Sequence, residues 1–264
     1  MLVRLRGVLR WSMDDLSLLI DLHIHGERQG PGSDTCTKKA IQLAGLNPEQ
    51  LLRIADLGSG TGASAMVLAE ALSAQVIAVD FVQPFLDTLT SRAGERGVAD
   101  QIKTICCSID ELPFEEHSLD VIWSEGAIYN IGFEHGARIW KRYLKPGGTL
   151  VTSEITWLTS ERPTELREHW CTEYPEIGLA SEKLAVLEQL GYEPEAFFVL
   201  PEECWIDHYY KPMQDRFAAY LERNNQSDDA RAVVAAEQLE IDLYQKFRSF
   251  FSYGMYVARV PALS

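Results

Sequence analysis

Residues 55–62 read ADLGSGTG and join two segments of different character. The apolar run 51–58 predicts a β-strand, and 61–72 has the composition of an α-helix. Glycines between a strand and a helix let the backbone approach a ligand closely, and the helix N-terminus adds a positive dipole. The stretch therefore predicts an α/β fold with a ligand site at the carboxyl end of its first strand.

Two acidic residues narrow the choice of ligand. Asp80 ends the next predicted strand, about 20 residues beyond the loop, as recognition of ribose hydroxyls requires. The spacing Gly58-x-Gly60-x-x-Ala63 also fits a dinucleotide fingerprint. Asp56, however, would face a pyrophosphate at short range, which is unfavourable, whereas it would favour the sulfonium and ammonium of S-adenosylmethionine. We therefore predict a methyl donor rather than a nicotinamide dinucleotide.

At these residues the sequence resembles the class I S-adenosylmethionine-dependent methyltransferases. The resemblance covers roughly residues 30–156, through ADLGSGTG, the acid of VIAVD, SIDELPF (108–114) and LKPGGTL (144–150). The whole chain, including GPGSDTCTKKAI, SEGAIYNIGFEHG and CWIDHYYKP, is also similar to a prokaryotic small-molecule branch of that family. The resemblance implies a Rossmann-like seven-stranded sheet with the last strand antiparallel and helices on both faces.

The resemblance also implies contacts with the cofactor. Asp56 and the glycine loop would hold the methionine moiety, and Asp80 would bind the ribose hydroxyls. Ser108 and Ile109 would lie beside the adenine; many relatives carry Asp in place of Ser108, and serine can also accept a hydrogen bond. Phe81 either covers an adenine face or packs in the core. The expected cofactor-binding residues are Asp56, Gly58, Ser59, Gly60, Gly62, Asp80, Phe81, Ser108, Ile109 and Glu125.

Strands and helices alternate along the rest of the chain. We expect helices at 12–27, 61–72, 82–97, 137–144, 164–173, 181–190, 203–223 and 227–248, and strands at 51–58, 75–80, 101–107, 118–124, 145–156, 195–201 and 252–260. Since no Pro/Gly linker interrupts this order, we expect one domain over 1–264. Within it, 1–35 would form an N-terminal helix and lid, 36–160 the cofactor-binding core, and 161–264 the remaining sheet with inserted helices that cover the substrate site.

Residues 121–132, VIWSEGAIYNIG, place an acid directly after the fourth predicted strand. In an open α/β sheet that end of the strand lies beside the ligand cleft. Glu125 has three open roles: a general base, a contact with cofactor or substrate, or an acceptor for backbone N–H groups of the following turn. Tyr129 and Asn130 could line the methyl-transfer path, or Asn130 could start the helix beginning near Gly132. The catalytic candidates are Glu125 and Tyr129.

The composition limits the partners. The 264 residues carry a formal net charge of -15, which argues against nucleic acid and anionic membranes. No apolar run reaches the roughly 18 residues that span a bilayer. The N-terminus MLVRLRGVLRW has no small-residue cleavage site, so we expect a soluble leader rather than a signal peptide. Five cysteines, an odd number without repeating spacing, fit the reducing cytoplasm.

No metal site is predicted. His23 and His25 lie two residues apart, so on a helix their side chains point about 200° apart and cannot share one ion. Cys36, Cys171 and Cys204 could gather as a soft-metalloid site, but nothing in their spacing supports it.

Aromatic residues crowd the second half of the chain. At helical spacing they are typical of a core, whereas the polar residues within CWIDHYYKP (204–212) suit a lid over an apolar or cationic substrate. The residues concerned are Trp157, Trp170, Tyr174, Trp205, Tyr209 and Tyr210.

Together these patterns predict methyl transfer from S-adenosylmethionine to a small-molecule acceptor by in-line displacement. Two alternatives remain at this point. One is a non-catalytic sensor of S-adenosylmethionine or S-adenosylhomocysteine, and the other is an NAD-dependent oxidoreductase.

Overall fold

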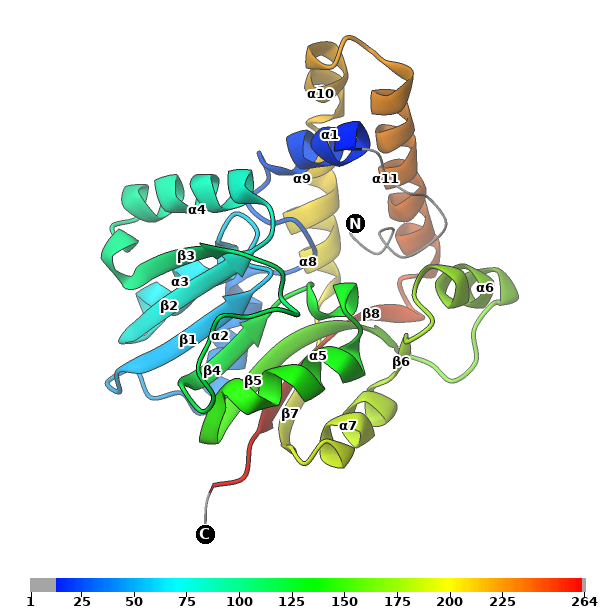
Figure 1. Cartoon of the computed structure of the whole chain (residues 1–264). Helices are drawn as coiled ribbons and strands as arrows, with labels where there is room; N and C mark the ends of the chain where they lie inside the picture. Colours follow the sequence, from blue (N-terminus) through cyan, green and yellow to red (C-terminus); the bar gives the residue numbers. More distant parts are fainter. Residues whose placement is uncertain (1–12, 263–264) are drawn as a thin grey trace.

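The computed structural model describes residues 13–262 and contains an eight-stranded sheet with the order β3-β2-β1-β4-β5-β8-β7, in which β6 pairs with β5 outside this path (Figure 1). Strands β1 to β5 pair in parallel, and β8 runs antiparallel to both β5 and β7. The expected α/β sheet with an antiparallel last strand is confirmed. The strands are β1 (Leu52–Leu57), β2 (Ala74–Asp80), β3 (Ile102–Cys106), β4 (Leu119–Ser124), β5 (Leu144–Trp157), β6 (Gly178–Leu179), β7 (Glu193–Val199) and β8 (Phe251–Arg259).

Helices cover both faces of the sheet, and a group formed by α1, α9, α10 and α11 rises beyond it (Figure 1). The expected leader at 1–12 lies outside the described residues. No described helix is long and apolar enough to cross a membrane. The helices are α1 (Met13–His23), α2 (Asp34–Leu43), α3 (Ala63–Ala71), α4 (Gln83–Glu95), α5 (Phe133–Trp140), α6 (Thr164–Glu173), α7 (Ala180–Gln189), α8 (Glu202–Trp205), α9 (Lys211–Gln214), α10 (Phe217–Arg223) and α11 (Asp228–Phe247).

The sheet separates two apolar layers. Ile54 and Ala55 are neighbours in β1, and they belong to opposite layers because successive side chains of a strand point to opposite faces. One layer includes residues of α2, α3 and α11, and the other includes residues of α5 and α7. With both faces covered, the inner strands β1, β4, β5 and β8 are buried through most of their length, and a ligand has access at the carboxyl ends of the parallel strands.

Helix α2 and strand β6 were not predicted. Ser33 caps α2, because its Oγ accepts a hydrogen bond from the backbone N–H of Cys36 at 3.1 Å. Thr35, Cys36 and Thr37 have low intrinsic helix propensity, which hides this helix in the sequence pattern. Strand β6 has only two residues, too few to produce an alternating pattern. The sheet therefore has eight strands instead of the expected seven.

The prediction of one helix over 203–223 was wrong. The segment contains α8, a π-helical turn (Ile206–Tyr210), α9 and α10. Pro212 has no N–H to donate to the preceding turn, so a regular α-helix cannot continue through it. The π-turn buries Tyr209 and Tyr210 together. The helix expected at 137–144 also differs from the prediction. It begins earlier, at Phe133, and is followed by a 3-10 turn (Lys141–Tyr143).

Candidate functional site

The glycine loop lies where β1 ends and α3 begins. Gly58 and Gly60 have φ angles of +73° and +53°, in the left-handed region that favours glycine. A Cβ atom on Gly58 would lie 2.2 Å from Cβ of Ala127, and one on Gly60 would lie 2.2 Å from Oε1 of Gln29. Both positions therefore need glycine for backbone conformation and for close packing against other segments.

Asp80 fixes the shape of this loop from the end of β2. Its Oδ2 accepts a hydrogen bond from the Gly60 N–H at 2.9 Å, and its Oδ1 accepts one from the Val82 N–H at 2.9 Å. Burial raises the pKa of Asp80, although these backbone hydrogen bonds act in the opposite direction. A carboxylate oxygen can accept two hydrogen bonds, so the Asp80 carboxylate can still accept from a ligand hydroxyl.

Asp56 and Ser59 each have a buried polar atom without a hydrogen-bond partner among the described residues. Oδ2 of Asp56 accepts from Ser64 Oγ at 2.8 Å, whereas Oδ1 has no hydrogen-bond partner among the described residues. Burial raises the pKa of Asp56 to about 7. Ser59 Oγ is likewise buried without a partner in the described part of the chain. Because such atoms are rare in folded proteins, they indicate groups that a ligand or water completes.

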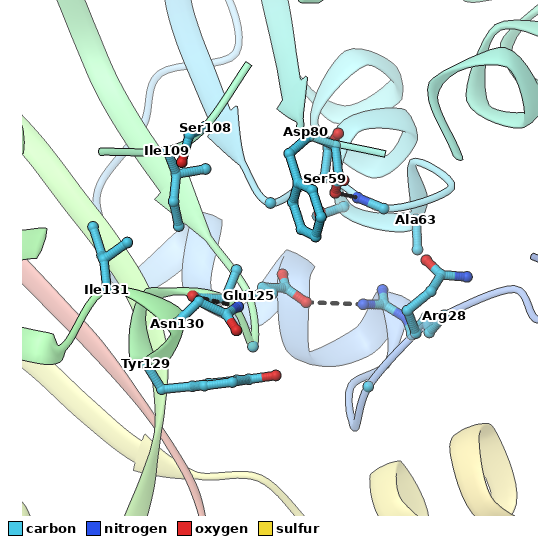
Figure 2. Close-up of a pocket in the computed structure, with 18 of the residues that line it drawn as sticks. Arg28, Ser59, Ala63, Asp80, Ser108, Ile109, Glu125, Tyr129, Asn130 and Ile131 are labelled. Carbon is cyan, nitrogen blue, oxygen red and sulfur yellow. Dashed lines mark hydrogen bonds and ion pairs between the residues drawn. The ribbon is translucent and has the colours of Figure 1, made fainter. Parts of the chain in front are cut away.

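One cavity of about 340 Å³ connects most of the predicted site residues. Its volume lies in the usual range for small-molecule sites. Asp56 and Gly62 are not among its lining residues, and Asp56 lies behind Ser64. Phe81 is 46% exposed, so it stands at the cavity rather than in the core. The predicted residues that do line the cavity are Gly58, Ser59, Gly60, Asp80, Phe81, Ser108, Ile109, Glu125 and Tyr129 (Figure 2).

Glu125 extends from the end of β4 toward Arg28 (Figure 2). Its Oε2 accepts from Arg28 Nη1 at 2.8 Å, and its Oε1 accepts from Thr37 Oγ1 at 2.7 Å and from Trp123 Nε1 at 2.9 Å. The side chains of Arg28 and Glu125 are only 10% and 7% exposed. The hydrogen bonds found for Glu125 thus come from side chains of three different segments.

Arg28 is held as a cation by this environment. Burial by itself lowers the pKa of Arg28, but the charges and hydrogen bonds of Glu125 and Asp34 outweigh it and raise that pKa. Nη2 of Arg28 lies 3.1 Å from Oδ1 of Asp34. Side chains of the protein already bind both carboxylate oxygens of Glu125, and this geometry weakens its general-base role.

The segment that carries Arg28 is fixed to the glycine loop. Gln29 Nε2 donates to Thr61 Oγ1 at 2.9 Å, and the Thr61 N–H donates to Gln29 Oε1 at 2.9 Å. Arg92 Nη1 donates to the Gly26 carbonyl at 3.0 Å. The sequence pattern predicts a lid within 1–35 but does not single out Arg28 or Gln29. The one feature of the sequence that could have indicated Arg28 and Gln29 is that this polar pair directly precedes the Gly-Pro-Gly turn.

Tyr129 and Asn130 lie in a 3-10 turn (Ile128–Asn130) on the other side of Glu125. The Tyr129 side chain is buried and forms an edge-to-face contact with Tyr174, with ring centroids 6.2 Å apart. Asn130 Nδ2 donates to the Ala127 carbonyl at 3.0 Å. Asn130 does not cap the next helix, because α5 begins at Phe133 with Gly132 as its N-cap.

The cysteines and histidines form no larger group. Cys36 and Cys204 are buried with their Sγ atoms 3.6 Å apart, whereas Cys171 is exposed on α6. His23 is buried at 3.5 Å from Glu237, and His25 is exposed. Within residues 13–262 no group of three His, Cys, Asp or Glu side chains could hold a metal ion.

Known proteins share this fold and sequence pattern. Residues 55–152 match the family described as methyltransferase domain. The 27-O-demethylrifamycin SV methyltransferase of Amycolatopsis mediterranei is 26% identical over 86% of this chain and 85% of its own length. The sarcosine/dimethylglycine N-methyltransferase of Aphanothece halophytica is 28% identical over 64% of this chain and 61% of its own length.

A solved structure extends the likeness of fold to almost the whole chain. The S-adenosylmethionine-dependent methyltransferase from Geobacter sulfurreducens, in complex with S-adenosyl-L-homocysteine, has a TM-score of 0.80 at 21% identity. It covers 92% of this chain and 97% of that one. The glycine loop at the end of β1 and the acid at the end of β2 both lie within the matched residues 55–152. The chain therefore carries a methyltransferase domain over residues 55–152, within a fold that it shares with an S-adenosylmethionine-dependent methyltransferase.

Proposed function

We propose that the chain methylates a small-molecule acceptor in the cavity enclosed by the glycine loop, residues 28–31 and the turn after β4. The observation that carries this proposal is one continuous cavity of about 340 Å³, which joins Asp80 and the loop to Glu125 and Tyr129. S-adenosylmethionine supplies an activated methyl group on a sulfonium, which the acceptor takes by in-line displacement. The task of the protein is then mainly alignment and exclusion of water, worth roughly 7–11 kcal/mol when the geometry is good.

The unsatisfied atoms near the loop fit the methionine end of this donor. Oδ1 of Asp56 is an acceptor suited to an ammonium group, and Ser59 Oγ is a donor suited to a carboxylate. Helix α3 begins at Gly62 without a side-chain cap, and the first N–H groups of a helix are suited to bind an anion. We propose that Asp56, Gly58, Ser59, Gly60 and Gly62 form this part of the site, with Asp56 and Gly62 acting from behind the cavity wall.

The opposite end of the cavity suits a nucleoside. We propose that Asp80 accepts from the ribose hydroxyls while it keeps the Gly60 and Val82 hydrogen bonds. Phe81 offers an exposed ring face for the adenine, and Ser108 and Ile109 lie on the wall that would border its edge. Ser108 replaces a carboxylate with a neutral hydroxyl, which gives a weaker acceptor for the adenine amino group.

Glu125 and Tyr129 border the part of the cavity where the methyl group would pass. We propose that Glu125 positions Arg28 and contributes negative charge toward the sulfonium, and that it is not the general base. The support is its hydrogen bonding by Arg28, Thr37 and Trp123. Tyr129, which lines both this cavity and a smaller one beside it, would contact the acceptor.

The relatives differ in the atom that they methylate. By their names, one acts on an oxygen of a rifamycin precursor and another on the nitrogen of sarcosine or dimethylglycine. Their names therefore do not fix the acceptor of this chain. The net charge of -15 supports a small molecule over a nucleic acid. We also propose that residues 1–264 act as one domain, with 1–35 and 161–264 closing the 36–160 core.

A thermal-shift titration of the full chain tests the donor site. S-adenosylmethionine and S-adenosylhomocysteine should each raise the unfolding temperature, since a ligand at a hundred times its Kd stabilises a protein by about 2.7 kcal/mol. NADH should not. Asp80→Asn should reduce the shift, whereas Asp87→Asn, the same change at an exposed position of α4, should leave it intact. A shift with NADH alone would contradict the proposal.

A further inference from the structure

Two buried thiols from distant parts of the chain are in contact. Cys36 lies in the first turn of α2 and Cys204 lies in α8, 168 positions further along the sequence, yet their Sγ atoms are 3.6 Å apart. Cys36 is 4% exposed and Cys204 is fully buried. Neither has a role in the proposed methyl transfer. Since a disulfide needs its sulfur atoms at about 2.05 Å, the two thiols lie about 1.5 Å from bonding distance.

The thiol pair lies between α8 and the segment that lines the larger cavity. Ser33 caps α2, and its Oγ also accepts from Cys204 Sγ at 3.5 Å. The Gly32 N–H donates to the Cys204 carbonyl at 3.4 Å. Residues 28–31, directly before these two, line the cavity. A bond between the sulfur atoms would therefore cross-link this segment to α8.

The two thiols differ in acidity, and this difference gives each a role. Cys36 is the third residue of α2, where the positive end of the helix dipole favours a thiolate. The hydrogen bond with Cys204 lowers the pKa of Cys36, although burial acts in the opposite direction. The same hydrogen bond, together with burial, raises the pKa of Cys204. Cys36 is thus the thiol that ionises first, and Cys204 is its neighbour in reach of any product formed on Cys36.

We propose that hydrogen peroxide oxidises Cys36 and Cys204 to a reversible disulfide, and that this bond fixes residues 28–33 against α8. Peroxide is little larger than water, so the small exposed area of Cys36 and brief local opening admit it. Formation of the bond is independent of the proposed function. Only its effect on the exchange of ligands rests on that function.

The reaction consumes one molecule of peroxide. The Cys36 thiolate attacks a peroxide oxygen, the O–O bond breaks, and the departing hydroxide takes up a proton to become water. The sulfur of Cys204 then attacks the sulfenic acid on Cys36, the S–S bond forms, and the S–O bond breaks with release of a second water. The two thiols lose two electrons and two protons in total. A small thiol restores them by exchange.

The cross-link acts on the part of the cavity wall that can open most easily. The glycine loop and the turn after β4 each continue a strand of the sheet, whereas residues 28–31 belong to neither helix nor strand. Side-chain hydrogen bonds hold Arg28 to Glu125 and Gln29 to Thr61, and such a segment opens at lower cost than a buried sheet. A disulfide beside it restricts that opening, so a bound product should leave the oxidised protein more slowly.

Peptide mapping by mass spectrometry tests the bond in the wild-type chain. After treatment with hydrogen peroxide and digestion without reductant, the peptides of Cys36 and Cys204 should be linked, with a mass about 2 Da below their sum, and dithiothreitol should separate them. The oxidised protein should unfold about 5 °C or more above the reduced one, because the bond closes a loop of 168 residues. Absence of the linked peptide, or a bond that leaves the unfolding temperature unchanged or lower, would overturn the proposal.

Matched variants connect the bond to the cavity. Cys36→Ser prevents the bond, whereas Cys171→Ser, the same change at an exposed position of α6, keeps it. Stopped-flow displacement of S-adenosylhomocysteine by excess S-adenosylmethionine measures how fast the product leaves. Peroxide should slow this step at least about threefold in the wild type and in Cys171→Ser, reversibly with dithiothreitol, and should not slow it in Cys36→Ser.

The outcomes separate this inference from the proposed function. A linked peptide together with an unchanged dissociation rate would overturn the claim that the bond fixes the cavity wall. Failure of the reduced wild type to bind S-adenosylhomocysteine would refute the proposed function. The peptide map and the unfolding temperature would still decide in that case whether Cys36 and Cys204 form the disulfide.

Discussion

Replacement of Asp56 by asparagine should stabilise the protein without ligand, in a way that depends on pH. Burial raises the pKa of Asp56 from 3.8 to about 7. The folded protein therefore keeps a proton on this group up to about pH 7, whereas the unfolded chain releases it near pH 3.8. The stability that this group contributes is fully present below pH 3.8 and is lost as the pH rises to about 7.

The size of the effect follows from the same values. Each tenfold change in proton affinity is worth about 1.36 kcal/mol, so the wild-type protein loses about 4 kcal/mol between pH 4 and pH 7 through Asp56 alone. Asparagine does not titrate, and its Oδ1 can still accept from Ser64. Relative to the wild type, the variant should gain about 1.4 kcal/mol in free energy of unfolding per pH unit up to about pH 7, and nothing further above it.

Urea unfolding of both proteins at several pH values between 4.5 and 8 measures this slope. An unsatisfied amide in the variant would shift all values equally and leave the slope unchanged. Asp100→Asn, at an exposed position, serves as the control and should show no such slope. A difference between Asp56→Asn and the wild type that is constant with pH would refute the reasoning, because Asp56 would then not be an isolated buried acid. S-adenosylmethionine should stabilise the variant less than the wild type.

Two further substitutions test the walls of the larger cavity. Arg28→Gln should lower the free energy of unfolding by about 3–5 kcal/mol in urea titrations, because it leaves Glu125 buried without its cation. Adding Glu125→Gln to this variant should recover part of the loss. Strictly additive losses from the two substitutions would argue against the ion pair. Gly60→Ala should weaken S-adenosylmethionine binding about tenfold or more in calorimetry, since its Cβ displaces Gln29 in addition to straining the backbone. Gly97→Ala, which has a positive φ and open space around it, is the matched control, and equal effects of the two would contradict this explanation.

The glycine loop and the acid beside it could be predicted from the sequence because their determinants are local. The loop 58–62, the acid that ends the next strand and the residues at 108–109 each lie at or just beyond the end of a strand. The carboxyl ends of parallel strands meet at one edge of a sheet, so order along the chain already brings these residues together. The resemblance to the methyltransferases rests on the same local patterns.

The rest of the site depended on tertiary structure. Arg28 reaches Glu125 across 97 residues of sequence, and a smaller cavity that shares Tyr129 with the larger one combines Trp170, Trp205, Glu240 and Tyr253 from separate helices and the last strand. Sequence periodicity assigns such aromatic residues to a buried face, but it does not say which faces meet. Only packing decides whether an aromatic ring fills the core or lines a cavity. Local chain geometry thus determined the glycine loop and the acid beside it, and the three-dimensional packing of distant segments decided which side chains complete the cavity.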